Sequence, residues 1–153
     1  MDGTSENLVL TTDDDALAKL YAYWRSKCGN RRFPARRDLD PCDFAYILGW
    51  ILLVDVTYDP LRFFIRLYGS ELVSRAGFDI TGTYLEDHPQ PEFRDYVDKA
   101  WRDTIARGEV THGRFDRWLD DRRYQFESLR LPLSSDGKTI DKLLVAIRHK
   151  DWE

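Results

Sequence analysis

The spacing of apolar side chains predicts a helix near the start of the chain, from about Asp14 to Lys27. Apolar residues recur there every three or four positions and form one stripe on an otherwise polar helix. Thr12 and Asp15 resemble a capping box with Asp in place of Glu, and Gly29 fits the end of the helix. The stripe must pack either on the body of its own domain or on a second copy. We expect a homodimer interface there and on an exposed part of the sheet, with the stripe residues Leu17, Leu20, Tyr21 and Trp24.

A short second helix is predicted from Asp40, as the cap, and Pro41, in the first helical position, to about Leu48. Two strands then follow, at about residues 50–57 and 62–68, and are expected to pair as an antiparallel hairpin. The first of them is apolar on both faces, which is typical of a central strand that is covered on both sides.

Residues 66–87, RLYGSELVSRAGFDITGTYLED, consist of short apolar runs punctuated by Gly69, Gly77 and Gly82. This spacing matches neither a dinucleotide-binding glycine loop nor a Walker loop. The glycines are instead expected to end a strand, to close a short helix and to permit a tight turn. We interpret the stretch as a helical crossover that covers one face of the sheet and is the best place for a pocket wall.

The clearest helix is predicted at about residues 92–107, and three β segments follow at about 110–119, 123–133 and 139–150. The last segment is again apolar on both faces, so it is expected to lie beside the other central strand. The prediction is an α+β fold with a five-stranded antiparallel sheet, a helical crossover on one face and an additional N-terminal helix. The expected divisions are a flexible N-terminus at 1–12, a helical segment and connector at 13–48, and a core domain at 49–150.

Composition restricts the classes of function. The chain has 153 residues, which fit one domain, and a net charge of −4, which disfavours a general nucleic-acid binder. The arginines of RRFPARR, at 31–37, form either a solvated connector or an anion contact. The chain begins without a secretory leader pattern, and its longest apolar run is too short to span a bilayer. We expect a cytoplasmic protein without membrane insertion, with Cys28 and Cys42 reduced.

Few side chains suggest a metal-binding or catalytic role. His88, His112 and His149 are far apart in sequence, so a metal site is not expected. His88 follows Glu86 and Asp87, and this group is either a local acid/base site or the start of a helix. His149 is expected near the surface, and no catalytic residue is assigned.

Aromatic side chains provide the best candidates for a binding pocket. Strand alternation places Tyr124 and Phe126 on one face of the sheet, with Arg130 further along the same face. If this face meets the long helix, an apolar cavity with polar handles results; the alternative is a filled core with Arg130 at its rim. The candidate pocket residues are Phe64, Tyr84, Phe93, Trp101, Phe115, Tyr124, Phe126 and Arg130.

The order of these elements resembles the PAS fold, and residues 77–85, GFDITGTYL, are similar to the G-hD-hTG-hhL segment of PAS domains, in which h is apolar. Residues 36–41, RRDLDP, resemble the R-x-D-hDP lead-in of small stand-alone PAS-like proteins of alphaproteobacteria. The resemblance covers about residues 16–150. It implies a bacterial sensory module that binds a small molecule between the sheet and the helices and that often dimerises.

The resemblance leaves the cofactor unknown. The flavin-binding type has a reactive Cys on the helical side, whereas both cysteines here precede the first strand. The haem-binding type usually carries a His on the long helix, and residues 92–107 contain none. We expect a non-enzymatic signalling module that acts through a protein partner, with a small ligand as a candidate modulator. The alternative is an enzyme or binding protein on a cone-shaped fold resembling nuclear transport factor 2, which places its long helices first.

Overall fold

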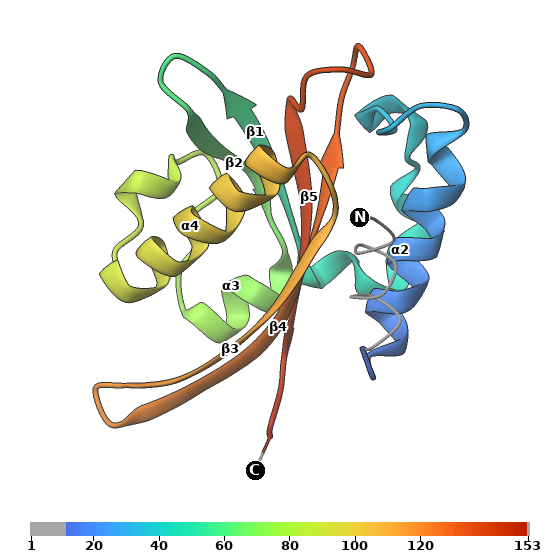
Figure 1. The fold of residues 1–153 in the computed structure, drawn as a ribbon. Coiled ribbons are helices and arrows are strands. Elements are labelled where there is room, and N and C mark those ends of the chain that lie inside the picture. Colours follow the sequence, from blue (N-terminus) through green and yellow to red (C-terminus); the bar gives the residue numbers. More distant parts are fainter. Residues whose placement is uncertain (1–11, 153) are drawn as a thin grey trace.

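The computed structural model describes residues 12–152, so the flexible N-terminus predicted at 1–12 lies outside the described residues apart from Thr12. Figure 1 shows a curved sheet with helices on both sides: α2 covers one face, and α3 and α4 cover the other. The helices are α2 Asp15–Cys28, η1 Arg36–Asp38, η2 Pro41–Trp50, α3 Ser70–Ala76, η3 Leu85–Asp87 and α4 Pro91–Arg107, of which the three η elements are 3₁₀ helices. The strands are β1 Ile51–Thr57, β2 Arg62–Tyr68, β3 Thr111–Leu119, β4 Arg122–Leu133 and β5 Lys142–His149.

The sheet has five antiparallel strands in the order β2-β1-β5-β4-β3. β1 and β5 lie side by side at its centre, with Ile51 opposite Ala146 and Val54 opposite Leu143, as their two-sided apolar character predicts. All four of these residues are fully buried because helices cover both faces. The predicted fold class is therefore confirmed. The alternative cone-shaped fold is wrong, since the long helix α4 lies between β2 and β3.

The strand β5 is shorter than predicted, because it begins at Lys142 and not at Thr139. The carboxylate of Asp136 accepts hydrogen bonds from the backbone N–H groups of Lys138 and Thr139, at 2.8 and 2.9 Å. It also accepts one from the hydroxyl of Ser134 at 2.8 Å. The turn therefore uses backbone donors that a longer strand would need for pairing.

The cap of α2 is Asp14, whose carboxylate accepts a hydrogen bond from the backbone N–H of Leu17 at 3.0 Å. The capping box predicted from Thr12 and Asp15 is wrong. The Thr12 hydroxyl accepts a hydrogen bond from the Asp14 N–H, at 3.2 Å, and donates one to Glu127. Thr12 thus joins the start of the helix to β4 and leaves the capping of the first turn to Asp14.

The apolar stripe of α2 packs on its own domain, which is the first of the two alternatives that the sequence left open. Leu17 and Leu20 are fully buried, and Tyr21 and Trp24 are nearly so. The indole Nε1 of Trp24 donates a hydrogen bond to the carbonyl oxygen of Pro132 on β4, at 2.9 Å. The dimer surface predicted at these four positions is therefore corrected, because the same chain already covers them with the apolar face of its sheet.

The crossover after β2 depends on a close approach of two backbone segments at Gly69. A Cβ atom at this position would lie 2.3 Å from the carbonyl oxygen of Gly49, which no side chain tolerates. Gly77 ends α3 in the left-handed conformation, with φ at 83°. The glycines thus act as the sequence predicted. Within residues 12–152, no helix combines the length and the apolar character that a membrane span requires.

Candidate functional site

A cavity of about 270 Å³ lies between the crossover, α4 and the face of the sheet that they cover. This volume lies just below the range of about 300–1,000 Å³ that is typical of small-molecule sites. One wall comes from the stretch that the sequence singled out, residues 66–87. Its lining members are Tyr68, Leu72, Arg75, Ala76, Phe78, Ile80 and Leu85.

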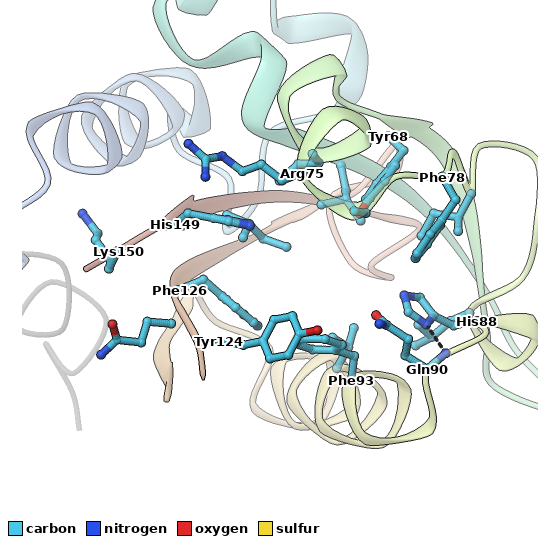
Figure 2. A pocket seen from close by; sticks show the side chains of 18 of the residues that line it. Tyr68, Arg75, Phe78, His88, Gln90, Phe93, Tyr124, Phe126, His149 and Lys150 are labelled. Carbon is cyan, nitrogen blue, oxygen red and sulfur yellow. Dashed lines mark hydrogen bonds between the residues drawn. The ribbon is translucent and has the colours of Figure 1, made fainter. Parts of the chain in front are cut away.

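The opposite wall is aromatic, and Figure 2 shows it facing Tyr68 and Phe78 across the cavity. Phe93 of α4 meets the ring of Tyr124 edge-on at a centroid distance of 4.9 Å and lies 6.0 Å from the ring of Phe126. Trp101, about two helical turns beyond Phe93 on α4, is buried and also lines the cavity. Half of the eight residues predicted for the pocket therefore line it: Phe93, Trp101, Tyr124 and Phe126.

Phe64 and Tyr84 do not line the cavity, although both were predicted to do so. The register of β1 and β2 shifts between Leu53 and Val54, so that β2 contains one extra residue. Because side chains alternate along a strand, this bulge reverses which faces they take. Phe63 consequently faces α4 and Trp101, at 5.4 Å, and Phe64 pairs with Tyr84 on the edge of the sheet, at 5.2 Å.

Phe115 and Arg130 also lie outside the cavity. Phe115 is 1% exposed and stacks on Phe126 at 4.8 Å, so it supports the aromatic wall from behind. Arg130 is buried further along β4, where its Nη2 donates to the hydroxyl of Tyr96 at 3.2 Å and its Nη1 contacts the Thr111 hydroxyl at 3.5 Å. Around Arg130 the space between α4 and the sheet is filled, as the second alternative from the sequence predicted. Arg130 lies inside this core, however, and not at its rim.

One end of the cavity carries polar side chains that were not predicted to line it. His88 is half-buried, and its Nδ1 accepts the backbone N–H of Gln90 at 3.1 Å. This is a helix-start contact, the second alternative that the sequence offered for His88. Desolvation and the charge of Arg94 lower the pKa of the His88 imidazole, which is therefore neutral at neutral pH. Because Nδ1 is an acceptor, Nε2 carries the proton and is available as a donor.

Tyr68 and His149 add two more neutral groups. Burial raises the pKa of the Tyr68 hydroxyl to about 12, so it remains a donor. His149 is exposed at the mouth of the cavity, near the surface as predicted. Desolvation, with the charges of Arg75, Arg122 and Arg148, lowers the pKa of its imidazole to about 4. No sequence signal identifies His88 and His149 as members of one site, since 60 residues separate them and only the fold brings them together.

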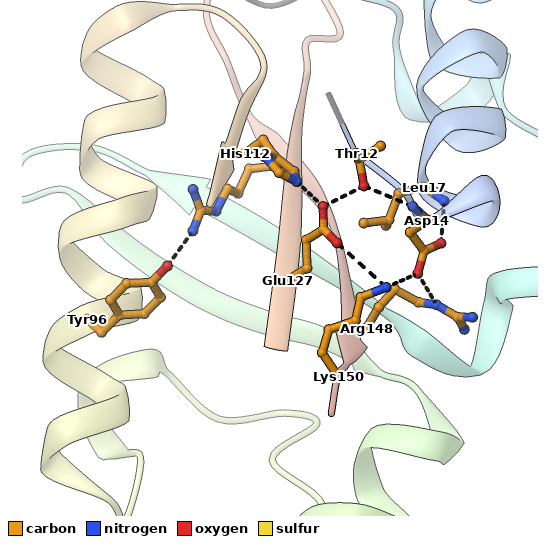
Figure 3. Close-up of polar contacts among 9 residues, drawn as sticks. Thr12, Asp14, Leu17, Tyr96, His112, Glu127, Arg148 and Lys150 are labelled. Atoms are coloured by element: carbon orange, nitrogen blue, oxygen red, sulfur yellow. Dashed lines mark hydrogen bonds and ion pairs between the residues drawn. The ribbon is translucent and has the colours of Figure 1, made fainter. Parts of the chain in front are cut away.

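A polar cluster occupies the opposite face of the sheet, beside the start of α2 (Figure 3). Its centre is Glu127, whose side chain is 2% exposed. The carboxylate accepts a hydrogen bond from the Thr12 hydroxyl, contacts Nε2 of His112 and lies 3.6 Å from the Lys150 ammonium. Burial alone would raise the pKa of Glu127, but the bonds from Thr12 and His112 and the charges around it outweigh this effect and lower the pKa.

Lys150 connects this cluster with the pocket. It belongs to the lining of the cavity, while its ammonium donates to the helix cap Asp14 at 2.7 Å and lies near Glu127. Arg148 donates to the same Asp14 carboxylate at 3.1 Å. The end of β5 is thus in contact with the cavity on one side and with the start of α2 on the other.

Among the described residues, the pocket lining contains no Ser, Thr or Cys, and its polar side chains are those of Arg, Lys, His, Tyr and Gln. Among residues 12–152, no three side chains of the metal-binding types converge on one point. The mixture of aromatic walls and a few polar groups is typical of pockets for small organic molecules.

Comparisons with known proteins identify the fold. The family model described as "PAS domain" matches residues 12–147. A sensory box sensor histidine kinase from Vibrio cholerae is 17% identical, with a TM-score of 0.51 over 72% of this chain and 92% of that chain. The PAS domain of a protein from Colwellia psychrerythraea is 12% identical, with a TM-score of 0.50 over 71% of this chain and 95% of that chain.

A third similar structure comes from a study of a light-oxygen-voltage domain with a flavin analogue. It is 14% identical, with a TM-score of 0.51 over 72% of this chain and 83% of that chain. No curated protein matches the chain. At these identities the solved structures establish the fold alone, whereas the family model covers most of the sequence. The chain belongs to the PAS domain family.

Proposed function

We propose that this protein is a sensory module that binds a small organic molecule in the pocket between α3, α4 and the sheet, and that it responds through contacts with a second protein chain. The observation that carries the proposal is the cavity of about 270 Å³ with its two facing aromatic walls. The PAS fold supports the same assignment, because domains of this family are typically sensory.

The response to a ligand would pass through the β3–β4 hairpin. Figure 1 shows this hairpin extending beyond the body of the domain. Its outer half contributes Tyr124 and Phe126 to the pocket wall, and Trp118, which pairs with Arg123 next to Tyr124, is 68% exposed. Tryptophan is enriched at the centres of protein interfaces. A ligand that displaces Tyr124 therefore acts on the element that presents Trp118, and we propose that a second copy of the chain binds there.

Native mass spectrometry of the freshly purified protein tests both parts, because it reports bound small molecules and oligomeric state together. The expected result is a dimer that carries a non-covalently bound small molecule. Val97→Phe fills the pocket from α4 and is expected to abolish this extra mass. Val73→Phe adds the same side chain on α3 outside the lining and is the matched control, which keeps the bound molecule.

Trp118→Ala tests the interface separately. It is expected to convert the dimer to a monomer without loss of the bound molecule, because Trp118 does not line the cavity. A ligand-free monomer of the unmodified protein contradicts both parts of the proposal. A dimer that persists in Trp118→Ala contradicts the proposed interface only.

A further inference from the structure

The charged side chains that line the pocket, among residues 12–152, are all basic. The chain as a whole has more acidic than basic residues, 27 against 23. The part of the lining that belongs to the described residues nevertheless contains no Asp or Glu, and it includes four permanent cations and two histidines, namely Arg75, Arg122, Arg123, Lys150, His88 and His149. A lining without carboxylates in an acidic protein selects against cationic ligands.

Two of the four cations lack an acidic partner among residues 12–152. Arg123 pairs with Asp116 at 2.9 Å, and Lys150 pairs with Asp14 and Glu127. Arg75, in contrast, lies over the ring of Trp50 at 5.0 Å, and Arg122 lies over the ring of Tyr124 at 4.8 Å. Both guanidinium groups are left with hydrogen-bond donors that no carboxylate of the described chain occupies.

These two arginines lie at the same end of the cavity. Both act electrostatically on His149, whose pKa they lower together with Arg148 after desolvation. Figure 2 shows Arg75 and His149 at the end of the cavity opposite His88 and Gln90. The positive potential is therefore concentrated at one end, the exposed mouth.

Much of the cavity wall is apolar, although Tyr68, His88 and Gln90 add polar groups to it. Leu52, Leu72, Leu85 and Trp101 line it and are each less than 5% exposed. Covering such a surface with an apolar group lowers the free energy of the complex. Placing a charged group against it raises that free energy. A ligand that satisfies both regions has an apolar body and a single negative charge at one end.

We infer that the pocket binds an amphipathic carboxylate, with its apolar body against Trp101 and Phe93 and its carboxylate at the mouth beside Arg75 and Arg122. This inference rests on the proposed function and adds the chemical class of the ligand to it. The carboxylate is the group that a guanidinium fork matches in shape and charge. The cavity of about 270 Å³ restricts the apolar body to roughly the size of one aromatic ring with a short chain.

Matched pairs of simple probes test the inference with the intact protein. The acids are phenylacetate, 3-phenylpropanoate and 4-phenylbutanoate, and each is compared with the alcohol that replaces its carboxylate by CH₂OH. Affinities are measured by isothermal titration calorimetry and checked by ligand-detected NMR. We expect at least one acid to bind about tenfold more tightly than its alcohol, and we expect added salt to reduce this preference.

Substitutions locate the anionic group. Arg75→Gln and Arg122→Gln are each expected to weaken binding of the acid by about 3- to 10-fold and to leave binding of the alcohol unchanged. Arg114→Gln removes an arginine that contacts Trp152 outside the pocket, and it is the control expected to change neither affinity. All three side chains are exposed, so their loss is not expected to prevent folding, which circular dichroism verifies.

The outcomes distinguish a failure of this inference from a failure of the proposed function on which it rests. If acids and alcohols bind equally, or if the arginine variants do not reduce the preference for the acid, the carboxylate assignment is overturned while the pocket remains a binding site. If no member of either series binds at millimolar concentration, and the purified protein carries no small molecule, the proposed function and the inference both fail.

Discussion

The buried carboxylate of Glu127 provides the sharpest test of how α2 is held on the sheet. Glu127→Gln keeps the shape of the side chain but removes its charge. Thr12 and His112 both contact Oε2, whereas Lys150 lies 3.6 Å from Oε1, so Gln can keep an uncharged oxygen for the first two partners but then turns its NH₂ group towards the Lys150 ammonium. Hydrogen bonds to charged groups contribute about 1.5–3 kcal/mol each, so the variant is expected to lose about 2–3 kcal/mol of unfolding free energy at pH 7. The melting temperature should fall by about 4–12 °C.

The effect should depend on pH in a defined direction. The folded-state pKa of Glu127 lies below its ordinary value of 4.5. A carboxyl group with a lowered folded-state pKa contributes stability above its unfolded pKa and loses that contribution as the pH falls through the folded value. The difference between the natural protein and Glu127→Gln is therefore expected to be constant near neutral pH and to shrink below about pH 4.5.

Urea unfolding followed by tryptophan fluorescence measures this difference at pH 7 and at steps down to pH 4. Glu86→Gln is the matched control, because Glu86 is 59% exposed and pairs with Arg62 at the surface. Its loss should be about 0.5 kcal/mol or less. A loss at Glu127 as small as that of the control, or one that does not shrink as the pH falls towards 4, would refute the reasoning.

Three further predictions concern packing and access. Gly69→Ala should destabilise the protein by about 1–3 kcal/mol in urea unfolding, because the added methyl group meets the carbonyl oxygen of Gly49 at 2.3 Å; an unchanged midpoint contradicts this clash. Trp24→Ala should cost about 3–5 kcal/mol without changing the oligomeric state, and a dimer that dissociates would restore α2 as the interface. A thiol reagent should modify the exposed Cys42 in the native protein and Cys28 only after unfolding; equal rates exclude the observed burial.

The sequence predicted the fold in outline because its strongest signals are local. The helical period of residues 92–107 appears as α4, and the two-sided apolar runs appear as the paired central strands β1 and β5. The turn-forming role of Gly77 follows from backbone sterics that act within a few residues. These features need no knowledge of distant parts of the chain.

The pocket was predictable only in part, because its lining depends on register and on contacts between distant segments. Tyr124 and Phe126 followed from regular alternation along β4, which the structure preserves. Phe64 did not, because an irregularity in the pairing of β1 and β2 reverses the alternation and leaves no mark in the pattern of residues. His88 and His149 belong to one cavity only because the crossover folds across the end of β5.

The sequence by itself determined which segments form helices and strands, and that α2 must bury one face. The tertiary structure alone decided which surface that face meets. An apolar stripe gains the same free energy from any apolar partner, so its pattern cannot distinguish the sheet of its own chain from a second copy. Two specific interactions place the stripe on its own sheet. Trp24 donates a hydrogen bond to the carbonyl oxygen of Pro132, and Asp14 forms ion pairs with Arg148 and Lys150. These contacts join residues more than one hundred positions apart, and only the folded chain brings them within reach of one another.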